Sequence, residues 1–202
     1  MCGRYTLATD AQALVDLFEI EHLLFDPSQY RPHYNIAPSQ AVPIVRWTQS
    51  GRELVLARWG LVPHWSREAQ TKYSTINARA ETVADKPTYR TAFKHKRCLI
   101  PATGFYEWKR SGDKKTPYHI RAQDGELFAF AGLWERWSKG EAGPLETCTI
   151  ITTTPNALME KLHHRMPVIL PPNLYDEWLE PAPLASDRLA DILVPHSAHG
   201  MQ

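Results

Sequence analysis

Closely spaced strand-like segments, joined by short turns rather than by long helices, are the feature that most constrains this fold. Residues 41–47 (AVPIVRW) and 53–59 (ELVLARW) are rich in β-branched and aromatic residues and flank a TQSGR turn. The same pattern recurs across the KRSGDKKT and QDG turns, in residues 98–108, 118–122 and 126–134. This succession of strands and turns is typical of a β-meander.

Helical patterns are short and do not alternate with strands as they would in βαβ units. Further strands are predicted at residues 147–153 and 165–170, with proline-containing loops at 31–40 and 60–66. Helical spacing of apolar residues predicts short helices at residues 10–19, 83–95, 155–162, 173–179 and 185–193. Thr9 is the expected cap of the first helix, and a proline stands near the start of the third. Since no repeat or polar linker interrupts residues 1–202, we predict a single α+β domain. Its curved, mainly antiparallel, barrel-like sheet would be flanked by short helices.

Composition limits where such a chain acts. Of its 202 residues 43% are apolar and 22% are charged, and no apolar run approaches the roughly 18 residues that cross a bilayer. The sequence MCGRYTLATD lacks the basic flank and apolar stretch of a signal peptide. Three cysteines favour a reducing setting, so we expect a cytoplasmic protein without a membrane partner. Nothing indicates an oligomer, and a net charge of +1 restricts nucleic-acid binding to a local groove.

A cysteine directly behind the initiator methionine is the most unusual single position. If Met1 is removed, Cys2 carries a free α-amine and a thiol, whose ordinary pKa values are about 7.7–8 and about 8.5. Both nucleophiles are then partly unprotonated near neutral pH, and no internal cysteine offers that pair. The simpler alternative is a terminal cysteine without a function, because residues next to a terminus are weakly constrained.

Two internal segments place polar residues where a core or a loop would not need them. Asn77 and Arg79 lie two apart in INARAET and therefore share one side of an extended segment. Such a pair can orient a reacting group and bind a phosphate. Glu107, between Tyr106 and Trp108, is in a position where partial desolvation would suit it to general acid–base chemistry. A turn asparagine, a surface arginine and a solvent-facing glutamate are the alternative interpretations.

The LHHRMP segment adds a histidine pair. His163 follows a predicted helix and is the candidate proton shuttle, whereas His164 is expected at the surface. Adjacent histidines cannot easily bind one metal, and the chain has no HExxH or CxxC pairing, so we predict neither a metal site nor a cofactor. A satisfied structural histidine remains the alternative. Cys98 and Cys148 lie among apolar strand residues and are expected to be core thiols.

Six segments, taken together and in order, resemble one protein family. They are MCGRY, RPHYNIAPSQ, WGLVPHW, INARAET, PATGFYEWK and LHHRMPVIL, which span nearly the whole chain. Through these six segments the chain resembles the SOS-response-associated peptidase (SRAP) family, and the resemblance implies the SRAP fold. Members of that family form a DNA–protein crosslink with abasic sites in single-stranded DNA. Several motifs match at once, which makes the resemblance specific.

The resemblance implies roles for individual residues. Cys2 would become the mature N-terminus and the crosslinking nucleophile, forming a thiazolidine with the abasic site. Asn77, Glu107 and His163 match the family's other catalytic positions. Single-stranded DNA containing abasic sites is therefore the expected partner, in a response to DNA damage. The resemblance also implies a protein that is nucleoid-associated when it is bound to DNA. The family name also implies a peptidase activity, self-removal of Met1, with lyase activity as a possible addition.

Six residues fall where the family lines its DNA groove: Arg4, Asn35, Trp65, Arg79, Trp108 and Arg165. The arginines would bind phosphates, and the tryptophans would offer faces on which unpaired bases stack. Family members usually continue into a Pro-Val-Ser strand and an asparagine-containing tail. This chain stops at HSAHGMQ, so that tail is expected to be missing.

Two other classes of function remain open. An N-terminal-nucleophile amidase would use the Cys2 thiol as nucleophile and the α-amine as base. It would turn over through a transient thioester, whereas the crosslinking interpretation predicts about one stable adduct per protein. A non-catalytic single-strand binding module would retain all of its activity when Cys2 is replaced by alanine.

Overall fold

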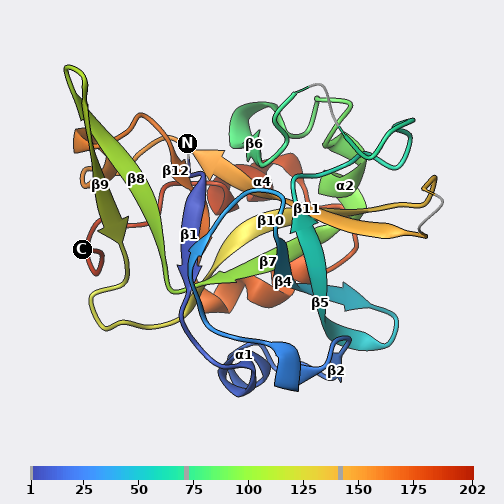
Figure 1. The fold of residues 1–202 in the computed structure, drawn as a ribbon. Helices are drawn as coiled ribbons and strands as arrows, with labels where there is room; N and C mark the ends of the chain where they lie inside the picture. Colours follow the sequence, from blue (N-terminus) through green and yellow to red (C-terminus); the bar gives the residue numbers. More distant parts are fainter. Residues whose placement is uncertain (1, 71–72, 141–142) are drawn as a thin grey trace.

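Five strands in this computed structural model form a closed ring (Figure 1). The order is β11, β10, β7, β4 and β5, and a parallel pairing between β5 and β11 closes it. Their bounds are β4 (Ala41–Thr48), β5 (Gly51–Trp59), β7 (Arg97–Ala102), β10 (Phe128–Trp137) and β11 (Leu145–Thr153). The other pairings around the ring are antiparallel. The structure describes residues 2–70, 73–140 and 143–202, and it confirms the predicted α+β domain with a barrel-like sheet.

A smaller antiparallel sheet lies beside the barrel in the order β3, β1, β8 and β9. Its strands are β1 (Arg4–Leu7), β3 (His33–Ile36), β8 (Gly104–Ser111) and β9 (Lys114–Ile120). Only Thr103 separates β7 of the barrel from β8 of this sheet, so the predicted strand at 98–108 is two strands in different sheets. This sheet positions the start of the chain, because β1 begins two residues after Cys2.

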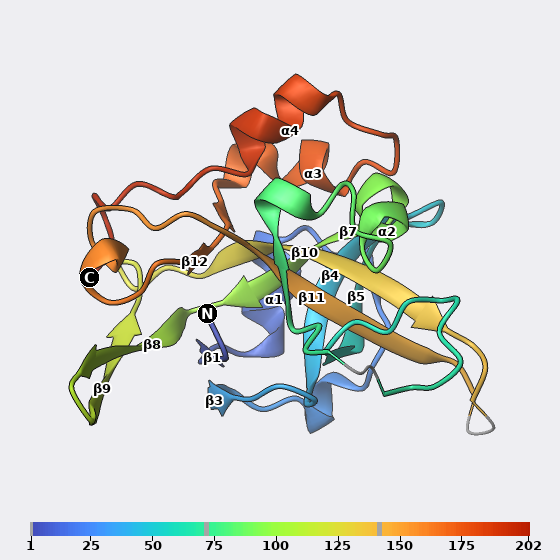
Figure 2. The same ribbon diagram turned by 90° about the horizontal axis from the view of Figure 1, so that it is seen from above.

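Shorter elements complete the chain. The short strands are β2 (His22–Leu23), β6 (Asn77–Arg79), β12 (Met166–Pro167) and β13 (Ile169–Leu170). The α-helices are α1 (Ala11–Leu17), α2 (Arg90–His95), α3 (Tyr175–Leu179) and α4 (Ser186–Ile192). Single 3₁₀ turns are η1 (Pro27–Gln29), η2 (Ala80–Thr82), η3 (Met159–Lys161) and η4 (Pro172–Leu174). Figure 2 shows α3 and α4 on one side of the barrel and β3 on the other.

Two helix predictions need correction. The first helix is capped by Asp10 rather than by Thr9, because the Asp10 carboxylate accepts the backbone N–H of Ala13. The predicted helix at 83–95 is reduced to α2. Pro87 accounts for this, since it lacks an N–H and disfavours helical geometry in the preceding residue.

Three other segments also differ from expectation. The predicted helix at 155–162 is only the 3₁₀ turn η3, and the predicted strand at 165–170 is two short strands, β12 and β13. The two strands pair with different neighbours, β11 and β10, because the chain crosses from one to the other at Val168. The proline-containing loop at 31–40 includes β3, whose pairing with β1 was not visible in the sequence.

An aromatic cluster joins the two sheets. The ring of Tyr5 packs edge-on against Trp59 and Phe130, with centroids 5.3 and 5.8 Å apart, and Phe105 packs edge-on against Phe130 at 6.0 Å. All four side chains are almost fully buried. Such pairs contribute about 0.5–1.5 kcal/mol each beyond the burial of their area. The cluster therefore fixes β1, and with it the start of the chain, against the barrel.

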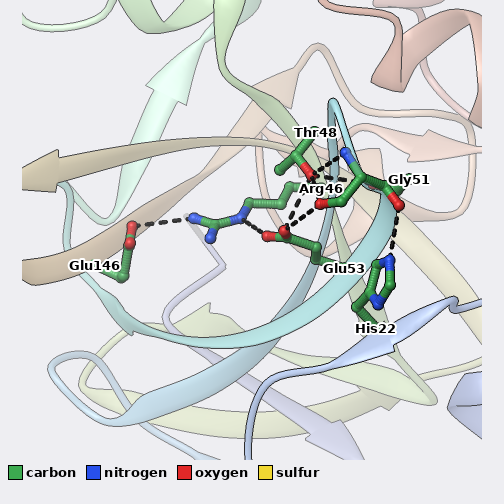
Figure 3. A network of polar contacts seen from close by, with 7 residues as sticks. His22, Arg46, Thr48, Gly51, Glu53 and Glu146 are labelled. Atoms are coloured by element: carbon green, nitrogen blue, oxygen red, sulfur yellow. Dashed lines mark hydrogen bonds and ion pairs between the residues drawn. The ribbon is translucent and has the colours of Figure 1, made fainter.

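A polar network stabilises one end of the barrel (Figure 3). Arg46 on β4 lies opposite Glu53 on β5, and its Nε donates to the Glu53 carboxylate at 2.8 Å. Arg46 also lies 3.3 Å from Glu146 on β11, and Thr48 donates to Glu53 at 3.0 Å. Burial alone would raise the pKa of Glu53, but the hydrogen bonds from Arg46 and Thr48 outweigh it and lower the pKa. The network therefore links three barrel strands through an ionised carboxylate.

Candidate active site

Cys2 lies at the entry to β1 and its side chain is fully buried. In Figures 1 and 2 β1 lies beside β8, with which it pairs from Arg4 onward. The thiol donates a weak hydrogen bond to the carbonyl oxygen of Arg4, with a sulfur–oxygen distance of 3.7 Å. Burial, and secondarily the negative charge of Glu107, raise the pKa of the thiol far above its ordinary value. The Cys2 thiol is therefore protonated at neutral pH rather than a reactive thiolate.

Asn77 binds the backbone of Cys2. It begins β6, which runs parallel to β11 and places the Asn77 amide beside the start of the chain. Nδ2 of Asn77 donates to the carbonyl oxygen of Cys2 at 3.0 Å. On the other side, the hydroxyl of Tyr89 donates to the carbonyl oxygen of Asn77 at 3.2 Å. A chain of hydrogen bonds thus fixes residue 2 relative to the barrel.

Glu107 and His163 complete this group of four residues. Glu107 lies on β8 with its side chain turned inward and only 2% exposed, close enough to influence the Cys2 thiol. Burial lowers the pKa of His163, although the neighbouring Glu107 carboxylate partly opposes that shift. The structure therefore brings Cys2, Asn77, Glu107 and His163 together from four separate segments. Their chemical roles stay predictions.

Three of the predicted groove residues lie close to this group. Arg4 follows Cys2 by two residues, and its Nη1 donates to Oδ1 of Asn35 at 3.1 Å. Arg79 is exposed on β6, two residues beyond Asn77. Arg4 and Asn35 thus contact each other near the start of the chain, and Arg79 shares β6 with Asn77, while their contacts with DNA stay predictions.

Trp108 lines an open cleft of about 650 Å³ that reaches His163. Its lining includes the cations Lys109, Arg110 and Lys161, none of which takes part in an ion pair between described residues. From the sequence, the basic segment after Trp108 was interpreted only as a turn, and none of these three residues was predicted to line a binding cleft. The basic residues within 109–115 were the signal for Lys109 and Arg110, whereas Lys161 lies outside that segment.

The two remaining predicted groove residues have other surroundings. Trp65 is 53% exposed and lines a separate cavity of about 460 Å³, whose described lining contains none of the four clustered residues. Arg165 is only 8% exposed, and its guanidinium forms a two-pronged ion pair with Glu81. The predicted phosphate contact of Arg165 would therefore compete with a carboxylate already bound to it.

The described residues contain no group of three His, Cys, Asp or Glu side chains arranged to bind a metal ion. Among those residues there is also no helix long and apolar enough to cross a membrane. Cys98 and Cys148 are fully buried and unpaired with each other, and burial raises the pKa of both thiols.

Comparisons with known proteins find similar chains. The chain is 46% identical over 203 residues to the abasic site processing protein YoqW of Bacillus subtilis, an alignment that covers 100% of this chain and 90% of YoqW. It is 32% identical to abasic site processing protein HMCES of Gallus gallus, over 83% of this chain and 59% of HMCES. It is 30% identical to abasic site processing protein YedK of Escherichia coli, in an alignment that covers 89% of this chain and 79% of YedK.

Solved structures and a family model extend the comparison. The crystal structure of a protein from Bacteroides thetaiotaomicron superposes with a TM-score of 0.89 at 30% identity, covering 100% of this chain and 90% of that one. The family model described as SOS response associated peptidase matches residues 1–202. The chain therefore belongs to the SOS response associated peptidase (SRAP) family.

Proposed function

We propose that this protein recognises abasic sites in single-stranded DNA and forms a covalent thiazolidine crosslink with them through Cys2, after removal of Met1. The observation that carries the proposal is the hydrogen bond from Asn77 to the carbonyl of Cys2, beside buried Glu107 and His163. Support also comes from three relatives that are named abasic site processing proteins.

The chemistry of the crosslink explains why cysteine must be the second residue. An abasic site exists partly as a ring-opened aldehyde. The α-amine of Cys2 adds to that carbonyl carbon, and loss of one water gives an imine. The thiol sulfur then adds to the imine carbon while its proton passes to the imine nitrogen, which closes a five-membered ring. This second attack is intramolecular, and effective molarities for well-oriented cases reach about 10⁵ M or more.

The burial of the thiol, which the structure shows in the chain that still carries Met1, fits this order of events. A protonated Cys2 thiol is a poor nucleophile, whereas an α-amine has an ordinary pKa of about 8 and is partly unprotonated at neutral pH. The amine therefore attacks first, and the thiol reacts once the imine carbon is next to it.

Neighbouring side chains supply proton transfers and alignment. Glu107 accepts the proton that the attacking amine loses and later assists loss of water. His163 donates a proton to the sugar oxygen during ring opening, or to the departing phosphate oxygen if the strand is cleaved. Asn77 fixes the Cys2 backbone. In a lyase reaction the same imine would precede strand cleavage, so lyase activity and crosslinking share one intermediate.

The peptidase step is proposed as a smaller activity of the same site. Self-removal of Met1 requires hydrolysis of the bond between Met1 and Cys2, next to the carbonyl that Asn77 binds. Protein expressed with a removable N-terminal fusion, then released with Met1 in place, tests this. Loss of Met1 by the purified protein, and its retention in Glu107→Gln, would support self-processing. Retention in the unaltered protein would assign the step to a general aminopeptidase.

Crosslinking itself is tested on a denaturing gel. Single-stranded DNA with one natural abasic site should give a slowly migrating band, whereas DNA with a tetrahydrofuran analogue, which has no aldehyde, should give none. An amidase would leave both DNAs unmodified and hydrolyse a small amide instead. A simple binding module would bind both DNAs and modify neither.

Arg79→Ala is expected to weaken binding to single-stranded DNA about tenfold, because an exposed guanidinium beside Asn77 would no longer neutralise a phosphate. The slope of log affinity against log salt should become shallower by about 0.7. Fluorescence anisotropy with the tetrahydrofuran analogue measures both quantities without crosslinking. The matched control is Lys94→Ala, which removes an exposed cation of α2. An unchanged salt slope in Arg79→Ala would assign Arg79 a structural role.

A further inference from the structure

The loop that carries Trp65 is held by side chains of β10 and of the residues that follow it. Nε1 of Trp137, the last residue of β10, donates to the carbonyl oxygen of Ser66 at 2.9 Å. Two residues further along, Nζ of Lys139 donates to the carbonyl oxygen of Trp65, also at 2.9 Å. The backbone that carries the indole of Trp65 therefore cannot rotate without breaking a hydrogen bond.

Glu135 binds the residue before Trp65. It lies two residues before Trp137, so the two side chains share one face of β10. Oε2 of Glu135 lies 2.9 Å from Nδ1 of His64, and Oε1 pairs with Lys96. A carboxylate only accepts hydrogen bonds, so Nδ1 of His64 carries the proton and donates. The Glu135 side chain is 3% exposed and the His64 side chain 48%, which makes His64 the outer partner of a nearly buried carboxylate.

Thr147 on β11 connects Glu135 with the start of the same loop. Its hydroxyl donates to the carbonyl oxygen of Glu135 at 3.2 Å and accepts the backbone N–H of Val62 at 3.0 Å. A buried charge without a partner is costly, so Glu135 favours the loop conformation that keeps His64 beside it. The loop is thus held at residue 62, at His64 and at the two residues after His64.

This fixed loop presents an exposed aromatic ring beside a cavity. Trp65 is 53% exposed and lines the cavity of about 460 Å³, together with Tyr89. The hydroxyl of Tyr89 donates to the carbonyl oxygen of Asn77, and Asn77 in turn binds the carbonyl oxygen of Cys2. Burial raises the pKa of Tyr89 to about 12, so its hydroxyl stays protonated at neutral pH. The cavity beside Trp65 therefore shares Tyr89 with the hydrogen-bond chain that fixes Cys2.

We propose that His64 is a positioning residue, which Glu135 holds in place so that the indole of Trp65 keeps one orientation. In that orientation the indole is a stacking face for an unpaired base next to the abasic site. A ring that is already ordered loses less conformational entropy when a base stacks on it. This role rests on the proposed function. It gives His64 and Glu135 a task in DNA binding although neither contacts the DNA.

Fluorine NMR of protein labelled with 5-fluorotryptophan tests the positioning without DNA. The Trp65 signal is assigned with Trp65→Phe. In His64→Ala this signal should move toward that of the free amino acid, because the ring then averages over several orientations. In His64→Asn it should stay in place, since the amide nitrogen of asparagine can replace Nδ1 and donate to Glu135. The signal of Trp178, which is fully buried, should not change in either variant.

A double-mutant cycle then shows whether His64 acts through Trp65. Fluorescence anisotropy with the tetrahydrofuran analogue should give an affinity about tenfold lower for Trp65→Ala, within the range for one stacked base. His64→Ala should lower the affinity about fivefold, since only a fraction of the protein then holds Trp65 in the binding orientation. The double variant should lose no more than Trp65→Ala alone. His199→Ala, which removes an exposed histidine outside this loop, is the matched control and should bind normally.

The salt dependence separates positioning from a phosphate contact. The slope of log affinity against log salt should be the same in His64→Ala as in the unaltered protein, because no cation that binds a phosphate is lost. A shallower slope in His64→Ala would mean that His64 itself contacts the DNA, and this would overturn the proposal.

Two further results would also overturn it. One is an unchanged Trp65 signal in folded His64→Ala, and the other is an equal loss of affinity on removing His64 with and without Trp65. The NMR measurement uses no DNA, so it decides the orientation of Trp65 even if the proposed function fails. Failure of that function would appear separately, as an unaltered protein that forms no crosslink with a natural abasic site.

Discussion

Cys2→Ala is expected to lose the stable crosslink completely while the protein keeps its fold and its affinity for single-stranded DNA. The α-amine of alanine can still form an imine with an abasic aldehyde, but without a thiol the ring cannot close and water reverses the reaction. Removing one small buried sulfur group costs about 1 kcal/mol, which a folded domain of this size tolerates.

A serine variant makes the test sharper. Cys2→Ser keeps the α-amine and can still form the imine, but a hydroxyl closes the ring less readily than a thiol does. The adduct of Cys2→Ser should therefore be trapped only when borohydride reduces the imine. Cys148→Ala is the matched control, because it removes an equally buried cysteine on β11 that carries no α-amine. The products are compared on a denaturing gel. A stable adduct in Cys2→Ala without reductant would mean that another residue is the nucleophile.

Arg97→Leu is expected to destabilise the protein by about 3–5 kcal/mol, a large share of the 5–15 kcal/mol typical of a folded domain. Arg97 lies on β7 and is 3% exposed. Its guanidinium donates to five backbone carbonyls, those of Phe93, Lys94, Trp178, Glu180 and Ala182. Several of these carbonyls belong to the C-terminal ends of α2 and α3, where a cation is electrostatically favoured.

The cost arises because leucine leaves the five carbonyls without a donor, two of them in buried contacts and three in partly buried ones. Each unsatisfied buried group costs about 1–3 kcal/mol, partly relieved where water can enter. Urea unfolding, followed by tryptophan fluorescence, should show a lower midpoint for Arg97→Leu. Lys94→Leu, at an exposed position of α2, should unfold close to the normal midpoint. A change of less than about 0.5 kcal/mol in Arg97→Leu, as for ordinary surface substitutions, would contradict this account of how α2 and α3 are attached.

The sequence predicted the strands of the barrel well, because residues 41–47, 53–59, 126–134 and 147–153 are rich in β-branched and aromatic residues. The sequence did not predict how the barrel closes. The parallel pairing of β5 with β11 joins Arg58 to Thr147, and no local pattern records a contact across so many residues. Helix boundaries were less accurate where proline interrupted a helical pattern, as at Pro87.

The candidate site, like the fold, was predicted only in part from the sequence. Cys2 stood out on its own chemistry, but Asn77, Glu107 and His163 formed a set only through resemblance to a family. The contact between Glu81 and Arg165 was not predicted, because it links residues 84 positions apart and depends on how β6 and β12 flank β11. Resemblance to the family placed Arg165 among the groove residues, and the structure shows a carboxylate bound to its guanidinium.

Intact mass spectrometry tests the central claim most directly. The purified protein is mixed with single-stranded DNA that carries one natural abasic site, and the product is measured without reductant. The account predicts one species whose mass equals the protein without Met1, plus the DNA, minus one water, and its absence in Cys2→Ala. DNA bound by the mature protein with no covalent species would contradict it.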